Sequence, residues 1–222
     1  MRTRVKICCM ASPGEAEMAA RAGADLIGLV GPMPSGPGVL TIPECATIAD
    51  SAPAWVGPVL LTSAETVDGL IAEVTGARVR TVQIVRHVPP EFHGELQAAL
   101  PGVRRIQVIH VEGGEALDLI DRYARHVDAF LLDSGRPGAA ELGGTGRVHD
   151  WDVSAEFVRR SPVPVFLAGG LKPDNAVEAI RKVKPFGLDI CSGVRTDDKL
   201  DEVKLMAFMA AVEGAAIEGA AA

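Results

Sequence analysis

The chain has 222 residues, of which 48% are hydrophobic and only 4% aromatic, and its formal net charge is −7. This length and apolar content fit one globular domain with an aliphatic core. The acidic balance excludes the overall basic surface that nucleic-acid-binding proteins use, so we predict no nucleic-acid partner.

The sequence carries no recognisable targeting or membrane-spanning segment. The first ten residues lack the apolar core of a signal peptide, and no apolar run approaches the length that a bilayer requires. The four cysteines, Cys8, Cys9, Cys45 and Cys191, do not form the framework of a secreted disulfide-rich domain. We therefore predict a cytoplasmic protein with no membrane partner.

Apolar strand-like segments alternate with helical patterns along the whole chain. Eight strand–helix units favour an α/β fold in which a parallel sheet closes into a single (βα)8, or TIM, barrel domain over residues 1–222, with a frayed tail from about 213. The strands are predicted at 4–9, 24–30, 56–61, 80–85, 104–111, 129–133, 163–168 and 186–191. The helices are predicted at 13–22, 43–51, 64–75, 90–99, 114–125, 152–160, 173–183 and 199–212.

Glycine-containing turns follow the last two predicted strands. Glycine lets backbone N–H groups approach an anion closely, and a helix N-terminus, predicted to open at Pro173, adds partial positive charge. In (βα)8 barrels, the loops after strands seven and eight commonly hold a phosphate. We predict a phosphate site here; the alternative is that the glycines only form tight turns. The residues are Gly169, Gly170, Ser192 and Gly193.

Two predicted loops exceed the usual length for connections in α/β units. They span 31–41 after the second strand and 134–147 after the sixth. Both would lie at the carboxyl ends of the strands, where barrel active sites are built. We predict that they are functional lids rather than tolerated surface insertions.

Two side chains at strand ends are candidate acid–base groups. Side chains alternate along a strand, so Lys6 and Cys8 are predicted on one face of the first strand, and Ile7 and Cys9 on the other. Asp133 ends the apolar sixth strand. A nearby ammonium would favour the Cys8 thiolate, which could then act as a base opposite the carboxyl group. The alternative is an inert buried cysteine and a loop-capping aspartate.

The last strand neighbours the first in a closed barrel and could bring Asp189 and Cys191 near Cys8. Without a histidine at metal-motif spacing, we predict no metal there. Asp189 and Arg195, which follows the last turn, are instead candidate substrate-binding residues.

Five segments of the chain match one enzyme family in order. They are VKICCM at 5–10, AGADLIGLV at 22–30, LLDS at 131–134, GGTGRVHDW at 143–151 and the glycine-rich region 165–194. On these segments the chain resembles phosphoribosylanthranilate isomerase of tryptophan biosynthesis. The resemblance implies a barrel that works without a cofactor and performs an Amadori rearrangement of N-(5-phosphoribosyl)anthranilate, a small phosphorylated aminosugar.

The resemblance also implies roles for individual residues. By position, Cys8 takes the role of the general base that removes the proton from ribose C2. Asp133 takes the role of the general acid that protonates the ring oxygen, so that the furanose opens to a Schiff base. The two glycine turns fall on the phosphate-binding positions.

Some positions depart from the family pattern. Cys9 stands where the family has glycine, Val85 where it has histidine, and Arg195 where it is usually acidic. After Ser35, Pro37 occupies the position of the arginine that holds the anthranilate carboxylate in the family.

Three interpretations follow from these departures. The chain is an isomerase of this substrate in which Arg86, Arg136 or Arg195 replaces the missing arginine, a paralogue that isomerises another phosphosugar, or a barrel that binds a phosphorylated ligand without catalysis.

Overall fold

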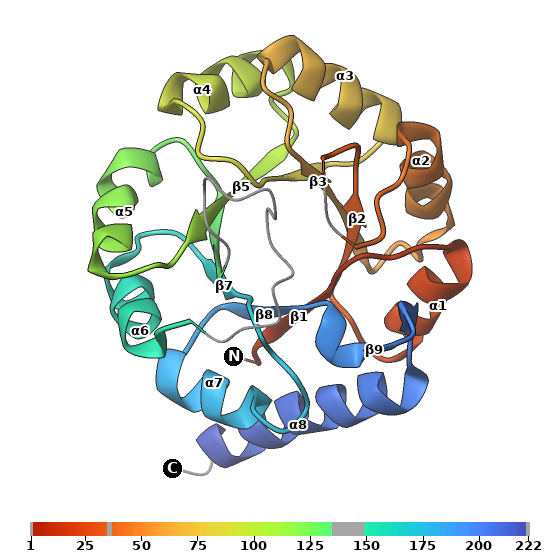
Figure 1. The fold of residues 1–222 in the computed structure, drawn as a ribbon, viewed down its shortest axis with the longest axis vertical. Helices are drawn as coiled ribbons and strands as arrows, with labels where there is room; N and C mark the ends of the chain where they lie inside the picture. The colour runs from red at the N-terminus through yellow and green to blue at the C-terminus, as the bar shows by residue number, and fades with distance from the viewer. Residues whose placement is uncertain (1, 35–36, 135–148, 221–222) are drawn as a thin grey trace.

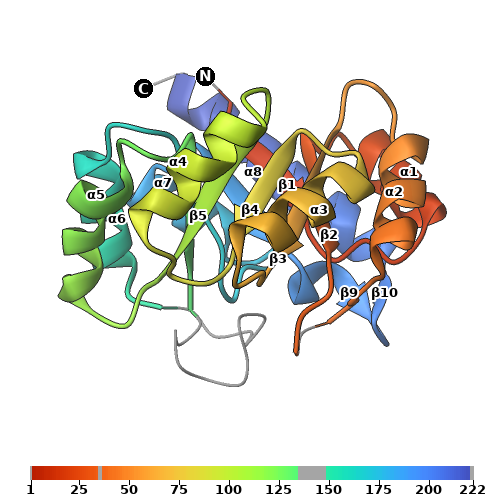
Figure 2. The ribbon, with the colours of Figure 1, turned by 90° about the horizontal axis from the view of Figure 1, so that it is seen from above.

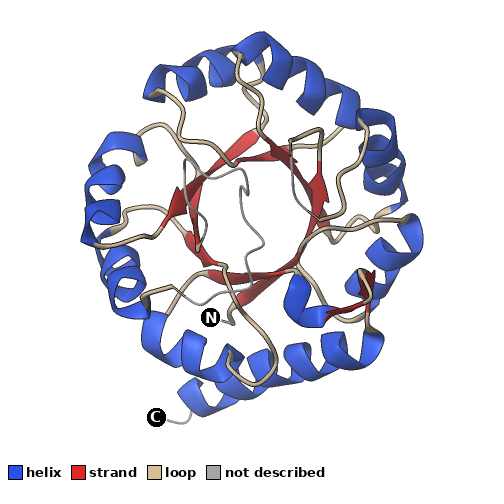
Figure 3. Ribbon diagram, in the orientation of Figure 1, coloured by secondary structure: helices blue, strands red, loops and turns tan. Residues whose placement is uncertain are grey.

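The fold is a closed barrel of eight parallel strands in a computed structural model, which describes residues 2–34, 37–134 and 149–220, the side chains of 216–220 excepted. Strands pair in the order β1 to β8, and β8 closes the barrel against β1. Viewed down the barrel, the helices form a ring around the strands (Figures 1 and 3). The predicted (βα)8 barrel is confirmed.

Each predicted strand segment overlaps one barrel strand, and the predicted bounds of the sixth strand are reproduced. Several strands are shorter than predicted because the chain enters the ladder after the apolar run begins or leaves it before the run ends. The strands are β1 (Arg4–Ile7), β2 (Leu26–Val30), β3 (Gly57–Thr62), β4 (Thr81–Ile84), β5 (Arg104–His110), β6 (Ala129–Asp133), β7 (Val165–Leu167) and β8 (Gly187–Ile190).

The helices lie between successive strands and after the last one. Two short 3-10 helices and a small hairpin supplement them. The helices are α1 (Pro13–Arg21), α2 (Ile42–Ser51), α3 (Val67–Ala77), α4 (Pro90–Ala99), η1 (Gly114–Leu117), α5 (Asp118–Tyr123), α6 (Trp151–Arg160), α7 (Ala176–Val183), η2 (Ser192–Val194) and α8 (Glu202–Ala220). The hairpin consists of β9 (Arg195–Thr196) and β10 (Lys199–Leu200).

Local side-chain hydrogen bonds fix where helices begin. Ser12 caps α1 by accepting a hydrogen bond from the backbone N–H of Glu15. Thr41 and Glu44 form a reciprocal capping box at the start of α2. These caps define the points at which the chain turns from the C-terminal face of the barrel into each helix.

Of the predicted helices, only 90–99 keeps its bounds. The helix expected to open at Pro173 begins at Ala176, because Asn175 binds the preceding turn: its side chain accepts from the N–H of Lys172 at 2.9 Å and donates to the carbonyl of Gly170 at 3.0 Å. The helix expected at 199–212 begins at Glu202, after β10, and continues to Ala220. The segment 114–125 divides into η1 and α5.

Apolar side chains fill two layers, one inside the barrel and one between strands and helices. The interior layer includes Val59, Val108, Leu131 and Phe166, and it reaches Cys8 at the C-terminal end of β1. The hairpin β9–β10 lies at the end of the barrel opposite the start of β1 (Figure 2). In the described part of the chain, no helix combines the length and apolarity needed to cross a bilayer.

Candidate active site

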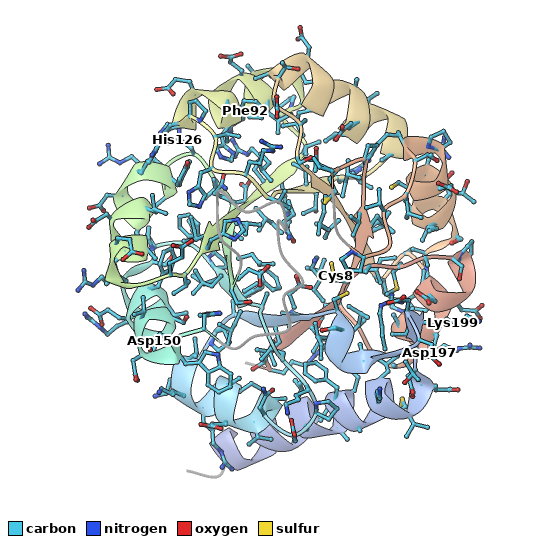
Figure 4. All side chains as sticks on the ribbon, viewed as in Figure 1. Cys8, Phe92, His126, Asp150, Asp197 and Lys199 are labelled. Carbon is cyan, nitrogen blue, oxygen red and sulfur yellow. The ribbon has the colours of Figure 1, made fainter. Side chains whose placement is uncertain are left out.

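A buried ammonium, a carboxylate and a thiol meet inside the barrel at the β1–β8 junction. Lys6 is fully buried, and its Nζ lies 3.0 Å from each carboxylate oxygen of Asp189 and 3.3 Å from Sγ of Cys8. The β1–β8 ladder pairs Lys6 with Asp189, so barrel closure itself brings these groups together. In the view down the barrel, Cys8 lies at the rim where β1, β2 and β8 meet (Figure 4). The predicted shared face of Lys6 and Cys8 is confirmed.

Gly28 on β2 leaves the space that this cluster occupies. A Cβ atom at position 28 would lie 2.6 Å from Sγ of Cys8 and 3.0 Å from Nζ of Lys6. Both separations are too short for van der Waals contact. The sequence interpretation missed this residue, although an isolated glycine within an apolar strand is a known sign of close approach.

The electrostatics of the cluster favour a charged lysine and an ionisable Cys8. Burial by itself would lower the pKa of Lys6, but attraction to Asp189 and to Cys8 outweighs it and raises that pKa. The pKa of Cys8 is lowered by a hydrogen bond from the Cys9 thiol and by the charge of Lys6, against the opposing effect of burial. A thiol in such surroundings becomes a base more readily than an ordinary cysteine.

Strand alternation predicted Cys9 on the face opposite Cys8, and the structure contradicts this prediction. β1 ends at Ile7, and Cys9 has φ = 64°, the left-handed region that favours glycine. Its Sγ lies 2.7 Å from Sγ of Cys191, and its side chain packs with the interior layer. The backbone conformation explains why glycine suits this position and why the alternation fails here.

Asp133 lies at the C-terminal end of β6, in line with Ala129 and Leu131, which face the barrel interior. It is half-buried, and one carboxylate oxygen accepts a hydrogen bond from the backbone N–H of Ser134 at 2.7 Å. Burial raises the pKa of Asp189, and the negative charge of Asp133 adds to that effect. Asp133 and the Lys6–Asp189 pair therefore act on each other across one barrel mouth.

The two glycine turns lie against each other. Gly169 and Gly170 have φ values of 80° and 64°, a backbone conformation that side chains disfavour. A Cβ atom at Gly193, within η2 and next to Ser192, would lie 2.0 Å from the carbonyl oxygen of Leu171. The turns after β7 and β8 therefore form one continuous backbone surface. A helix start at Pro173 does not contribute to it.

His149 borders the same region and was not singled out from the sequence. Its Nδ1 would lie 3.1 Å from a Cβ atom at Gly169, and its Nε2 is 2.7 Å from the hydroxyl of Ser154. Burial lowers the pKa of His149, while the charges of Asp133 and Asp150 oppose this. No local motif in the sequence marks this residue, because its position depends on α6 packing beside the β7 turn.

Arg195 is not a free cation at the barrel mouth. Its guanidinium lies 2.9 Å from a carboxylate oxygen of Glu15 on α1 and also donates to the backbone carbonyls of Cys8 and Cys9. Its side chain is only 7% exposed. Arg195 thus fixes the backbone after β1, and these contacts argue against the substrate-binding role that the sequence suggested.

Arg86 is a second candidate to replace the family arginine, and it lies within the described residues. It follows β4, and its Nη1 lies 3.1 Å from the carboxylate of Glu65, which is 74% exposed. Pro37 is exposed and carries no charge. Ser35, Gly36, Arg136 and most of the second proposed lid lie outside the described residues.

Within the described ranges, no three histidine, cysteine or acidic side chains are grouped so that they could bind a metal ion. A cavity of about 620 Å³ opens at the amino-terminal end of the barrel, where Arg4, Trp55 and Phe186 are among its lining residues. It lies away from Cys8 and Asp133, which are at the opposite end of the barrel.

Comparisons with known proteins identify the family of the chain. The family model of N-(5'-phosphoribosyl)anthranilate isomerase matches residues 37–211. The chain is 35% identical over 204 residues to the isomerase of that name from Methanocella arvoryzae, covering 92% of this chain and 94% of the relative. It superposes on phosphoribosyl anthranilate isomerase from Thermococcus kodakaraensis with a TM-score of 0.78 and 30% identity, covering 95% and 98% of the two chains.

A further solved structure has the same fold and contains a bound ligand. It is a phosphoribosyl anthranilate isomerase in complex with reduced 1-(o-carboxyphenylamino)-1-deoxyribulose 5-phosphate; its TM-score is 0.80 at 23% identity, with 96% of this chain and 99% of that chain covered. From the family match and the near full-length similarity to the archaeal relatives, the chain belongs to the N-(5'-phosphoribosyl)anthranilate isomerase family.

Proposed function

We propose that this protein converts N-(5'-phosphoribosyl)anthranilate to 1-(2-carboxyphenylamino)-1-deoxyribulose 5-phosphate in tryptophan biosynthesis. The observation that carries the proposal is the thiol of Cys8, which has a lowered pKa, contacts Lys6 at 3.3 Å and shares the barrel mouth with Asp133. Membership of the family supports the choice of reaction.

The proposed mechanism uses one acid and one base. Asp133 gives its proton to the ring oxygen as the bond from that oxygen to C1 breaks, and the nitrogen lone pair forms the C1=N bond of the Schiff base. The Cys8 thiolate then removes the proton from C2, and the electron pair of that bond neutralises the iminium nitrogen. The resulting enolamine tautomerises to the ketone. Lys6 stays protonated and keeps Cys8 ionised.

The two ends of the substrate require separate contacts. We assign the phosphate to the backbone surface formed by Gly169, Gly170, Ser192 and Gly193, where N–H groups can meet its oxygens. We assign the anthranilate carboxylate to Arg86, whose present partner is the exposed Glu65 and can be exchanged at little cost. Asp189 supports Lys6 and does not itself contact the substrate in this proposal.

The proposal also fixes a setting for the enzyme. A catalytic thiolate has to stay reduced, and the four cysteines are free thiols, so we place the reaction in the reducing cytoplasm. The single barrel carries the acid, the base and the phosphate contacts, so no second domain or cofactor is required.

Loss of either catalytic group is the direct test. Cys8→Ser and Asp133→Asn should each lower kcat by roughly 10²–10⁴-fold, because that is the usual contribution of a general acid or base. The measurement is a coupled assay with freshly generated phosphoribosylanthranilate. Cys45→Ala is the matched control, since Cys45 is a thiol buried on α2. Near wild-type kcat in either variant would contradict the assigned pair.

The assay also separates the alternative functions that Pro37 keeps open. Turnover by the wild type together with a strong rise in KM for Arg86→Gln supports the anthranilate substrate and its proposed carboxylate contact. Absence of turnover, with gain of turnover on Pro37→Arg, would favour a paralogue for another phosphosugar. Binding of inorganic phosphate without turnover of any aldosylamine would favour a non-catalytic barrel.

A further inference from the structure

Two thiols that take no part in the proposed reaction meet beside the catalytic cysteine. Sγ of Cys9 and Sγ of Cys191 are 2.7 Å apart, and Cys191 donates a hydrogen bond to Cys9. The residues are 182 positions apart in the chain, but the β1–β8 ladder, which pairs Ile7 with Ile190, brings them together. A disulfide has an S–S distance of about 2.05 Å, so the sulfurs need to approach by less than an ångström.

The backbone around Cys9 keeps its thiol in this position. Its left-handed φ of 64° is held from outside the β1 strand: Arg195 donates to the Cys9 carbonyl, and Gly38 packs so closely that a Cβ atom there would lie 3.3 Å from the same oxygen. Arg195 is itself bound to Glu15. Cys9 is therefore pre-positioned against Cys191 in the folded protein.

The three thiols differ in access. Cys8 and Cys9 are each 5% exposed, whereas Cys191 is half-buried and is the one that a small reagent in the barrel mouth would reach first. The fourth thiol, Cys45, is fully buried on α2. This order of access sets the order of reaction with a small disulfide.

We propose that Cys9 and Cys191 form a reversible disulfide, with an oxidised low-molecular-weight thiol such as glutathione disulfide as the oxidant, and that this modification switches Cys8 off. The Cys191 thiolate attacks one sulfur of the oxidant, forming a mixed disulfide and releasing one thiolate. Cys9 then loses its proton and displaces the second thiolate. Two protein thiols are oxidised, and the reagent disulfide is reduced to two thiols.

The consequence for Cys8 follows from its interaction with Cys9, whose side chain packs beside it in the same interior layer. The Cys9 S–H is the strongest influence that lowers the pKa of Cys8. In a disulfide, Cys9 has no proton to donate, so the Cys8 pKa rises and less thiolate is present at neutral pH. Loss of turnover rests on the proposed isomerase function, whereas the disulfide and the change in Cys8 reactivity do not.

The first measurement is chemical and independent of turnover. The full-length protein is incubated with glutathione disulfide, its free thiols are counted, and digested peptides are sequenced by mass spectrometry. The four free thiols should fall to two, with fragment ions linking Cys9 to Cys191, and dithiothreitol should restore all four. Cys8→Ser should keep the link, and Cys191→Ser should lose it. A Cys8–Cys9 link, or glutathione remaining on Cys191, would overturn the proposal.

The second measurement tests the effect on Cys8. Alkylation of Cys8 by iodoacetamide at pH 7 should slow by roughly threefold or more in the oxidised protein, because less thiolate is present. Isomerase activity is compared as the ratio of oxidised to reduced protein, which should fall for the wild type and for Cys45→Ala but stay near one for Cys191→Ser. A complete disulfide with unchanged alkylation of Cys8 would disprove the switch. If no form of the protein has isomerase activity, the proposed function is wrong. The alkylation rates then still test whether the disulfide changes the reactivity of Cys8.

Discussion

The barrel buries two polar clusters, on opposite faces of its sheet. They differ in whether their side chains keep an ionisable group that can react. The mouth cluster, Lys6, Cys8 and Asp189, lies inside the barrel and combines an ion pair with an ionisable thiol. The helix-side cluster, His93, Arg105 and Gln107, lies between β5 and α4.

In the helix-side cluster the donors are paired, although Nδ1 of His93 is buried without a hydrogen-bond partner among the described residues. The Gln107 amide donates to the carbonyls of Arg86 and Val108 and accepts from the His93 ring, while Arg105 binds Gln97 and Asp128. Each of these strong donors meets an acceptor of the protein itself. Burial of polar side chains therefore does not identify a reactive site. An ionisable group that faces the barrel mouth, such as the Cys8 thiol, does.

The largest expected difference between the two clusters is the loss of stability when the buried cation of each is replaced. Lys6→Met leaves Asp189 buried without its counter-charge and should lower the free energy of unfolding by about 3–5 kcal/mol. In Lys6→Met/Asp189→Leu neither charge remains, so much of this loss should be recovered. Arg105→Met should cost less, because its partner Asp128 is 41% exposed and can be hydrated. Urea unfolding measures all three; equal losses for Lys6→Met and Arg105→Met would contradict the distinction.

Acid should affect the helix-side cluster through His93. Burial lowers the pKa of this fully buried ring to about 4, although the hydrogen bond to Gln107 opposes the shift. An unfolded histidine titrates near 6.5, so between pH 6.5 and 4 the folded state binds fewer protons than the unfolded state. Stability should therefore be complete above 6.5 and fall by on the order of 3 kcal/mol as the pH drops to 4.

The control for this pH effect is substitution of the ring. His93→Gln removes one titrating group, so the slope of unfolding free energy between pH 6.5 and 4 should be shallower than in the wild type. Burial also lowers the pKa of His87 to about 4, so this ring adds to the same pH dependence of stability. A double variant, in which both histidines are replaced, removes its contribution as well. An unchanged slope in the double variant would show that neither histidine is buried in its neutral form.

The smallest expected effect is at Cys9, which lies next to the mouth cluster. Cys9→Gly relieves the left-handed φ and should change the free energy of unfolding by about 1 kcal/mol or less. It also removes the hydrogen bond to Cys8, so the acidic limb of kcat/KM should move to higher pH. Cys9→Ser retains a donor and should move it less. An identical acidic limb in the glycine variant would exclude Cys9 as an influence on Cys8.

Much of the fold was predictable because its signals are local. Eight apolar runs separated by helical patterns define the barrel, and the predicted bounds of β6 and α4 match the structure. Pro173 misled the prediction of α7, since proline is favoured both in turns and at helix starts. Here Asn175 binds the carbonyl of Gly170, and that bond keeps Pro173 in the turn.

The candidate site was predictable only in part, because several of its contacts join distant segments. Cys8 and Asp133 stand at strand ends, which sequence alternation can locate. The binding of Arg195 to Glu15 spans 180 residues and depends on how the β8 turn meets α1. The strand pattern also implied that Cys9 points away from Cys8, because alternation assumes an extended backbone that ends here at Ile7.

The lack of a side chain at Gly28 has an evolutionary consequence. Any side chain at position 28 would collide with Sγ of Cys8 and Nζ of Lys6, so a lineage that keeps both groups can accept no substitution there. Loss of Lys6 alone removes only the contact with Nζ; the closer contact with Sγ of Cys8 remains, so Cys8 also has to change before a side chain at 28 becomes tolerable, and the return of either group is then blocked. Positions 6, 8 and 28 should therefore change together and in a preferred order, while the exposed position 37 can drift alone.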